Sequence, residues 1–155
     1  MEVCCRRAEQ SDAARIIEFN QRLASETEGK TLPPETICRG VERGLQRHPE
    51  VQYFVAEADG TVVGQLMFTR EWSDWRDGWM LWLQSVYVDR DFRRRGVFQR
   101  LLEQSVQVLM NDEDVVGVRL YVERENDSAI AVYRQLGFRD AGYHIFERLV
   151  QESTI

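Results

Sequence analysis

Cysteine and histidine are scarce in this chain of 155 residues, which contains three cysteines and two histidines. Cys4 and Cys5 are adjacent, Cys38 lies far from both, and no C-x-x-C pair occurs. This pattern fits neither a disulfide framework nor a zinc site. His48 and His144 are isolated and lack the spacing of metal ligands. We therefore expect free thiols and no bound metal.

Long apolar runs are absent as well. No stretch approaches the roughly 18 apolar residues of a membrane-spanning helix, and the opening residues MEVCCRRAEQSD contain no apolar signal-peptide core. The net charge is −6, which argues against the broad basic surface that would neutralise the phosphates of a nucleic acid. These absences predict a cytoplasmic protein that binds neither membranes nor nucleic acids.

What is present is typical of one globular domain. Hydrophobic residues make up 43% of the chain and charged residues 30%, which is far from the composition of a disordered protein. A chain of this length buries roughly 70% of the surface that its unfolded form exposes. No internal repeat, linker or low-complexity segment interrupts it. We expect a single domain over residues 1–155.

Hydrophobic periodicity predicts an α/β fold. The run WMLWLQSVYV, residues 79–88, is apolar at nearly every position, as in a central strand covered on both faces. Asp59-Gly60 marks a tight turn, and EWSDWRDG, residues 71–78, is predicted to be a polar loop. In chain order we expect a strand, two helices, three strands, a helix, a strand, a helix and a last strand, over about residues 3–7, 12–24, 35–47, 51–58, 61–70, 79–88, 96–109, 115–122, 128–136 and 142–150. Helices should therefore cover a mixed sheet.

Arginines gather at one place in this acidic chain, between a buried strand and a helix. Arg93 to Arg95 precede Gly96, where the helix is expected to start. A helix N-terminus carries unpaired N–H groups and a partial positive charge, and glycine lets the backbone approach closely, so the segment suits a phosphate. The alternative is a solvated loop whose arginines pair with Asp89 and Asp91.

This segment resembles the acetyl-CoA motif of the GCN5-related N-acetyltransferase (GNAT) family, R/Q-x-x-G-x-G/A, which follows a strand ending in an apolar-x-apolar run. Residues 93–98 are RRRGVF, and Val86-Tyr87-Val88 supplies the run. Phe98 departs from the pattern, because the family has glycine or alanine at that position. We expect its ring to turn toward the core.

A second segment resembles the family's other signature, N-x-x-A-x-x-x-Y followed by G-F. The matching residues are Asn126, Ala129, Tyr133, Gly137 and Phe138. The two matches stand in the family's order and at its separation. Together they indicate membership far more strongly than either motif alone.

The resemblance implies a mixed, mostly antiparallel sheet of about six to seven strands with a splayed central parallel pair, flanked by about four helices. It implies an acyltransferase that moves the acetyl group from acetyl-CoA to a primary amine of a small molecule or peptide, by direct attack within a ternary complex and without a metal. Many members dimerise through a sheet edge, so a homodimer is also among the expectations. The alternative is a non-catalytic CoA-binding or regulatory module of the same fold.

The resemblance also implies which residues hold acetyl-CoA. Backbone N–H groups from about Arg94 to Phe98 would hold the diphosphate, and the backbone of Val86 and Val88 would pair with the pantetheine arm. A freed N–H near the end of that strand, at Val88, would face the thioester oxygen. The implied cofactor-binding set is Val86, Tyr87, Val88, Arg93, Arg94, Arg95, Gly96, Val97, Phe98, Asn126 and Tyr133.

Two of these residues have a structural alternative. Tyr133 is the candidate general acid, since a tyrosine hydroxyl can donate a proton to a departing thiolate, but it fits equally a core aromatic at helical spacing. Asn126 is expected to bond to the cofactor's arm, or simply to cap the helix that follows it. The general base stays open among Glu71, Glu123, a water held by Gln84, and solvent.

The resemblance further implies that the acceptor enters opposite the cofactor, over the early helices and the loop between the third and fourth strands. An acidic and aromatic lining suits a cationic amine, although tryptophans there could equally serve packing. The candidates for acceptor contact are Glu26, Glu28, Glu71, Trp72, Asp74, Trp75, Gln84 and Glu123. A loose P-loop match at residues 24–31, ASETEGKT, is disfavoured because it follows a helix and contains two glutamates that would repel phosphate.

Overall fold

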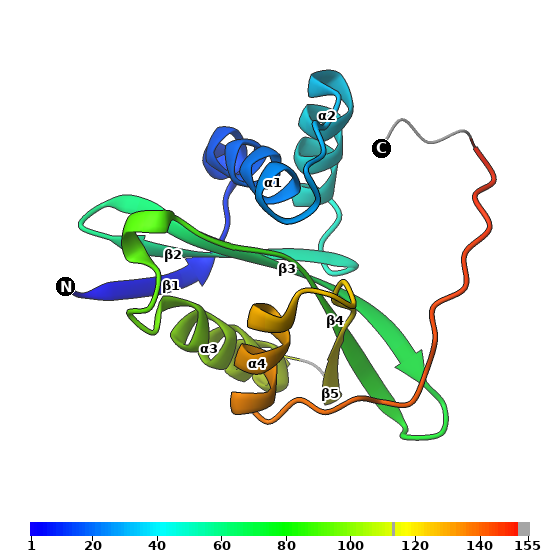
Figure 1. The fold of residues 1–155 in the computed structure, drawn as a ribbon. Helices are drawn as coiled ribbons and strands as arrows, with labels where there is room; N and C mark the ends of the chain where they lie inside the picture. The colour runs from blue at the N-terminus through cyan, green and yellow to red at the C-terminus, as the bar shows by residue number, and fades with distance from the viewer. Residues whose placement is uncertain (113, 152–155) are drawn as a thin grey trace. The chain divides into compact units, whose positions relative to one another are not determined.

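The computed structural model describes residues 1–112 and 114–151, and the chain divides into two units, Met1–Tyr121 and Val122–Ile155. The strands of the first unit are β1 (Val3–Arg7), β2 (Val51–Ala58), β3 (Thr61–Ser73), β4 (Gly78–Val88) and β5 (Val115–Leu120) (Figure 1). Its helices are α1 (Ala13–Glu28), α2 (Pro34–Leu45) and α3 (Val97–Asp112), with short 3-10 turns at Gln10–Asp12 and Arg90–Phe92. The described part of the second unit contains α4 (Asp127–Gln135).

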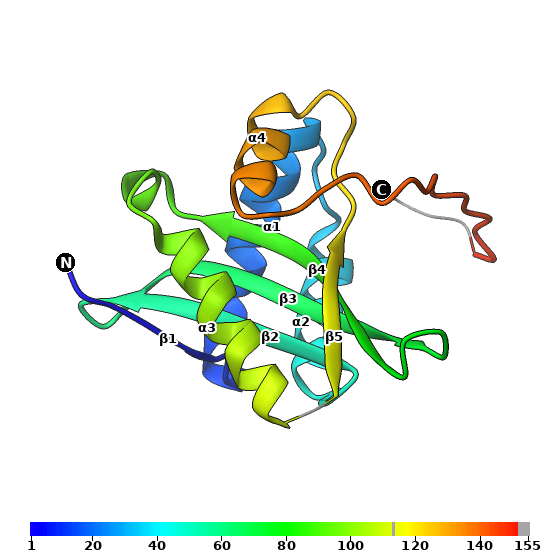
Figure 2. The same cartoon turned by 90° about the horizontal axis from the view of Figure 1, so that it is seen from below.

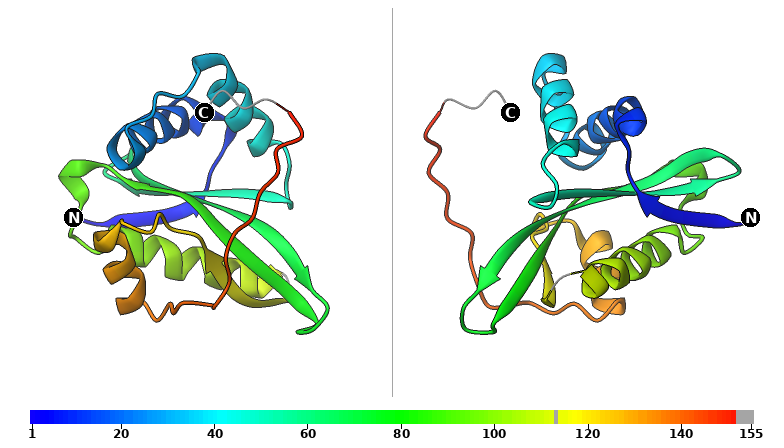
Figure 3. Two further views of the ribbon diagram at one scale, coloured as in Figure 1. Left: turned by 45° about the vertical axis from the view of Figure 1, so that its right-hand side comes forward. Right: turned by 180° about the vertical axis from the view of Figure 1, so that it is seen from behind.

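The strands form one mixed sheet in the order β1-β2-β3-β4-β5. Neighbouring strands are antiparallel except β4 and β5, which run parallel. Helices α1 and α2 lie over one face of the sheet and α3 over the other (Figures 1 and 3). This arrangement confirms the expected α/β class and the element order as far as α4. It corrects the expected central place of residues 79–88, because β3 is the middle strand of the described sheet and β4 lies between β3 and the edge strand β5.

The core of the first unit lies on both faces of the sheet. Ile16 of α1 and Val41 of α2 pack with Tyr53 and Val55 of β2 on one side. Leu101 of α3 is completely buried on the other side. Each such side chain contributes roughly 1.5–3 kcal/mol by leaving water. The helical periodicity of apolar residues therefore fixes which face each helix turns to the sheet.

The tryptophan-rich segment is a correction to the expected loop at residues 71–78. The β3–β4 hairpin continues through it, with Trp72 opposite Trp79 and Ser73 opposite Gly78. The two indole rings lie edge to face at 5.0 Å, and the Arg70 guanidinium lies 4.2 Å from the Trp79 ring. Cross-strand aromatic and cation–π contacts stabilise paired strands, so this polar sequence is held in the hairpin.

The expected last strand at residues 142–150 and the expected six to seven strands are also corrected. The sheet of the described residues has five strands, and residues 143–149 adopt no regular secondary structure. Large apolar side chains there, among them Ile145, Phe146 and Leu149, are exposed. Alternating hydrophobicity permits a strand, but a strand forms only where a neighbouring backbone pairs with it, and local pattern carries no information on that pairing.

Candidate active site

The parallel strands β4 and β5 separate at one end of the sheet. Their pairing runs from Trp79 opposite Val115 to Leu83 opposite Leu120, where β5 ends. Strand β4 continues to Val88 while still paired with β3 (Figure 2). Among the residues that the structure describes in this unit, the final part of β4 therefore has no strand on its β5 side. The family resemblance implies a splayed parallel pair at this end of the sheet, and that splay stays a prediction.

A β-bulge lies where that pairing stops. Gln65 of β3 is opposite Tyr87 and Met67 is opposite Gln84, so two residues of β4 face one of β3. Ser85, inside the bulge, has φ 52°, a left-handed conformation that is uncommon for residues other than glycine. Bulges bend a strand and can end its pairing with a neighbour. This one lies at the start of the open segment of β4.

The backbone of Val88 points toward the open edge. The Asp89 N–H donates to the Val63 carbonyl of β3 at 2.8 Å. Adjacent residues of a strand direct their N–H and C=O groups to opposite edges, so those of Val88 point away from β3. The Val88 carbonyl accepts a hydrogen bond from Arg93 Nε at 2.8 Å. The end of β4 thus presents polar backbone groups away from β3.

The loop between β4 and α3 ends in a cluster of available N–H donors. Arg94 has φ 62° and Gly96 has φ 74°, and α3 begins at the next residue, Val97. Within residues 1–112 and 114–151, no backbone acceptor is paired with the N–H groups of Arg94, Arg95, Gly96 or Val97. No atom lies within 4 Å of the position that a Cβ on Gly96 would occupy. Successive unpaired N–H groups at a helix start form a concavity that suits an anion.

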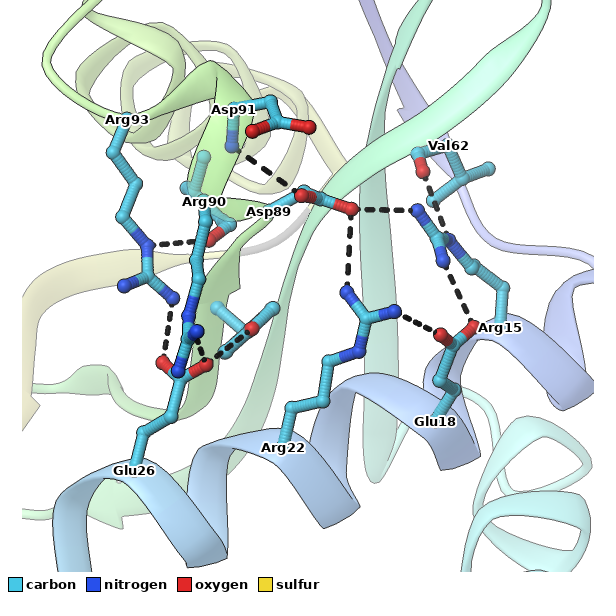
Figure 4. A network of polar contacts seen from close by, with 11 residues as sticks. Arg15, Glu18, Arg22, Glu26, Val62, Asp89, Arg90, Asp91 and Arg93 are labelled. Atoms are coloured by element: carbon cyan, nitrogen blue, oxygen red, sulfur yellow. Dashed lines mark hydrogen bonds and ion pairs between the residues drawn. The ribbon is translucent and has the colours of Figure 1, made fainter.

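One carboxylate of α1 neutralises part of the arginine cluster (Figure 4). Glu26 accepts hydrogen bonds from Arg93 at 2.7 Å, from the Tyr87 hydroxyl at 2.9 Å and from Arg90 at 3.0 Å. Burial alone would raise the pKa of Glu26, but the bonds from Arg93 and Tyr87 hold it below its ordinary value. Burial and the same carboxylate raise the pKa of the Tyr87 hydroxyl. Glu26, a candidate for acceptor contact, is therefore engaged within the protein.

The expected alternative, in which the arginines pair with neighbouring aspartates, is not what the structure has. Asp89 instead pairs with two arginines of α1, Arg15 at 2.9 Å and Arg22 at 3.4 Å (Figure 4). Both of these arginines also pair with Glu18. Helix α1 is thus joined to the loop after β4 by two neighbouring ion-pair clusters.

The other residues expected near the acceptor are spread over the first unit, and several already have partners. Glu71 pairs with Arg119 across β3 and β5 at 3.1 Å. Gln84 donates to the Thr69 hydroxyl at 2.7 Å. The Glu28 carboxylate Oε1 lies 3.9 Å from the Lys30 Nζ. Glu71 and Gln84 therefore already make bonds within the protein, whereas the Glu28 carboxylate is about half exposed.

The two candidate tryptophans differ in their exposure. Trp72 is 47% exposed and packs on Trp79, whereas Trp75, in the turn of the hairpin, is 88% exposed. Asp74 belongs to the same turn. Packing therefore accounts for Trp72, whereas the exposed Trp75 stays a candidate for acceptor contact.

The second unit explains the other signature in structural terms. The Asn126 side chain caps α4 by accepting from the Ala129 N–H at 3.3 Å, which confirms its capping role. At the other end Gly137 has φ 90°, and the Phe138 N–H returns to the Tyr133 carbonyl at 3.0 Å. This geometry is a Schellman motif, completed by the Tyr133 and Phe138 rings at 5.7 Å.

Two further candidates lie in the same unit. Burial raises the pKa of the Tyr133 hydroxyl above its ordinary value, so the hydroxyl stays protonated at neutral pH. The Glu123 carboxylate accepts the Glu125 N–H at 2.8 Å in the loop before α4. The Tyr133 hydroxyl is therefore partly shielded from solvent, and the Glu123 carboxylate is bonded within its own loop.

Sequence reasoning missed Gln65, which is fully buried beside the bulge. Its Nε2 donates to the Ser85 carbonyl at 3.1 Å. The available signal was a single amide within the otherwise apolar run VVGQLMF. Among the described residues no cluster of three or more potential metal ligands occurs, and no helix is long and apolar enough to span a membrane.

The model of the acetyltransferase (GNAT) family matches residues 13–138. The chain belongs to this family. It is accordingly an acyltransferase that transfers an acetyl group to nitrogen, and GNAT enzymes take that group from acetyl-CoA. The match includes both the arginine loop and the helix that carries Tyr133.

Individual relatives agree with this assignment. The chain is 34% identical over 143 residues to an N-alpha-acetyltransferase of Saccharolobus solfataricus, covering 86% of this chain and 78% of that protein. A crystal structure of a possible acetyltransferase from Clostridium difficile 630 matches with a TM-score of 0.89 at 41% identity, over 98% of this chain and all of that one. A ribosomal-protein-alanine N-acetyltransferase from Brucella melitensis biovar Abortus 2308 has a TM-score of 0.78 at 17% identity, covering 96% of this chain and 99% of that one, and shares the fold.

Proposed function

We propose that this GNAT enzyme acetylates the α-amino group at the N-terminus of a peptide or protein by direct attack on acetyl-CoA within a ternary complex. The names of the relatives support a peptide acceptor. Besides the N-alpha-acetyltransferase of Saccharolobus solfataricus, the relatives include the [Ribosomal protein bS18]-alanine N-acetyltransferase of Salmonella typhimurium, which is 42% identical to this chain over 59 residues. That match covers 38% of this chain, so it supports the acceptor class rather than one acceptor.

The opening beside β4 and the loop that follows it carry the proposal. Strand β4 runs past the end of β5 and leads into a loop in which the N–H groups of residues 94–97 have no backbone acceptor among the described residues. A diphosphate fits this loop, because its oxygens need several convergent donors, and Arg94 and Arg95 add positive charge. In our proposal the N–H groups from Arg94 to Phe98 hold the diphosphate, with the Phe98 ring turned aside.

The open segment of β4 would position the pantetheine arm. Backbone groups of Val86 and Val88 would pair with its amides, as a further strand would. The Val88 N–H would then face the oxygen of the thioester, where a preorganised donor stabilises the charge that develops during attack. Asn126 would hold the same arm in addition to capping α4.

The transfer itself needs one bond made and one broken. The neutral amine nitrogen attacks the thioester carbonyl carbon and forms the C–N bond. The C–S bond then breaks, the thiolate leaves, and the nitrogen releases its extra proton to solvent to give the amide. Tyr133 would donate its hydroxyl proton to that thiolate and recover one from solvent. The acceptor ammonium first loses a proton to a base, for which Glu71, Glu123, water on Gln84 and solvent are the candidates.

The test uses three acceptors that differ in their amines. One peptide carries a free N-terminus, the second has the same sequence with an acetylated N-terminus and a free lysine, and the third acceptor is a small diamine. We expect release of CoA, detected with a thiol reagent, only with the first peptide, and a mass increase of one acetyl group at its N-terminus. Activity confined to the diamine would contradict a peptide acceptor.

Initial rates at varied concentrations of both substrates test the direct attack. A ternary complex predicts intersecting double-reciprocal lines, whereas an acetylated enzyme intermediate predicts parallel lines. Parallel lines together with an acetylated protein in the absence of acceptor would overturn this part of the proposal.

A further inference from the structure

Gln65 combines features that packing does not explain. Its side chain is 0% exposed in the middle of β3. Its Oε1 is the one buried side-chain nitrogen or oxygen atom without a hydrogen-bond partner across residues 1–112 and 114–151. Burying a polar atom without a partner destabilises a protein, and native structures contain few such atoms. An apolar residue of the same size would avoid this cost, so the amide at this position needs another reason.

The amide nitrogen of Gln65 makes a hydrogen bond that explains why an amide occupies this position. Its Nε2 donates to the Ser85 carbonyl at 3.1 Å. Ser85 holds the left-handed φ of 52° inside the β4 bulge, and the strand register shifts between Gln65 and Met67. A residue other than glycine keeps such a conformation only where its surroundings hold it there. Gln65 supplies a side-chain bond to the backbone of that residue.

The position of the bulge connects this bond to the site. Pairing of β4 with β5 ends at Leu83, and the bulge begins within the next two residues. A bulge bends its strand and redirects the groups that follow it. The proposed function assigns the backbone of Val86 and Val88 to acetyl-CoA; Val86 is the second residue of the bulge, and Val88 lies two residues after it.

We infer that Gln65 is a positioning residue that holds the Ser85 bulge, and with it the final segment of β4, in the geometry needed for acetyl transfer. Placing the Gln65 Nε2 donor beside the Ser85 carbonyl leaves Oε1 buried without a partner, which lowers the stability of the folded protein. This inference rests on the proposed function of the β4 edge. Its role is indirect, because Gln65 acts through Ser85 and does not touch the substrates.

The primary test is the Gln65→Leu variant, in which the volume is kept and the amide is removed. We expect a melting temperature close to that of the wild type, because the variant removes the unpaired Oε1 but also takes the side-chain donor from the Ser85 carbonyl. We expect kcat to fall about tenfold to 100-fold, since small displacements of reacting groups reduce rates by this order. A lower melting temperature with unchanged kcat would show a purely structural role and overturn the inference.

The matched control is Gln52→Leu. Gln52 is also buried, at 4% exposure, but it lies on β2 and donates nothing to β4, its oxygen instead accepting from Arg7. We expect this variant to lose stability and keep kcat. Equal losses of kcat in both glutamine variants would contradict a specific role of Gln65.

Rescue by glycine tests the connection to Ser85. Glycine adopts a positive φ without support, so Ser85→Gly should restore at least part of the kcat lost in Gln65→Leu, while the single Ser85→Gly variant stays close to the wild type. Failure of the double variant to recover any activity would overturn the proposed route through the bulge. Gln65→Met serves as a second apolar replacement, and failure of both Gln65 variants to fold would show a structural requirement instead.

Hydrogen exchange separates this inference from the proposed function. In the free protein, amides of residues 84–88 should exchange faster in Gln65→Leu than in the wild type or Gln52→Leu, and more slowly again in the double variant. This readout needs no substrate. If the wild-type enzyme acetylates none of the acceptors, the proposed function fails, whereas unchanged exchange at these residues refutes the role of Gln65.

Discussion

At the scale of single residues, Tyr133 is the side chain on which the proposed chemistry depends most. A tyrosine hydroxyl is protonated at neutral pH, and burial raises the pKa of Tyr133 further above its ordinary value. We predict that Tyr133→Phe lowers kcat by about 100-fold, the lower end of acid catalysis, and leaves the dissociation constant of acetyl-CoA nearly unchanged. Steady-state kinetics and calorimetry measure the two quantities.

Tyr53→Phe is the matched control for that measurement. Burial raises the pKa of the Tyr53 hydroxyl as well, but this residue belongs to the core between β2 and the first two helices. Its replacement should leave kcat unchanged. Full activity in Tyr133→Phe would remove Tyr133 from the mechanism.

Two glycines provide a second prediction at this scale. Gly137 ends α4 with φ 90°, which an L-residue adopts with strain, so Gly137→Ala should lower the free energy of unfolding by about 1–2 kcal/mol. Gly40 lies inside α2 without a positive φ and with open space around its Cβ position, so Gly40→Ala should raise that free energy by up to about 1 kcal/mol. Urea unfolding of both variants checks the opposite signs. Equal effects would exclude the helix-end geometry as the cause.

At the scale of elements, the contact between α1 and the loop after β4 depends on Glu26. Its carboxylate joins Tyr87, Arg90 and Arg93, but Arg90 and Arg93 are well exposed, so solvent weakens these pairs. We predict that Glu26→Gln lowers the free energy of unfolding by about 1 kcal/mol at low salt and by less at high salt. Urea unfolding at two salt concentrations measures both values.

The exposed Glu42 of α2 offers the corresponding control. Its replacement by glutamine removes the same charge without touching the arginine loop and should change stability little at either salt concentration. A Glu26→Gln effect that does not depend on salt would indicate loss of packing rather than loss of ion pairs.

At the scale of the whole molecule, stability should fall in acid. The hydrogen bond from Arg6 lowers the pKa of Asp12, and Arg6 also pairs with Glu57, so this cluster ties β1 to the start of α1 and to β2. A carboxyl whose pKa is lower in the folded state stabilises the protein fully above its unfolded pKa, about 4. That contribution is lost as the pH falls below this value.

The Asp12→Asn variant tests this source of acid sensitivity. It should melt at a lower temperature than the wild type at pH 6, and the difference between the two should shrink as the pH falls toward 2. Glu42→Gln should instead follow the wild-type curve throughout. A constant difference between Asp12→Asn and the wild type at every pH would contradict the assignment.

The sequence by itself determined the local structure and the family of this protein. Periodicity predicted the helices and the first five strands, because each depends mainly on its own residues and on which face they bury. The two signatures predicted the arginine loop before α3 and the end of α4, since helix termini need particular residues at fixed positions.

Only the tertiary structure decided the features that depend on distant partners. The end of β4–β5 pairing at Leu83, the bulge at Ser85 held by Gln65, and the capture of Arg93 by Glu26 each join residues from separate elements. The segment after α4 has the alternation of a strand and yet lies outside the five-stranded sheet of the described residues. Strand pairing and ion pairing are set by which backbones and charges the fold brings together, and a local pattern does not contain that information.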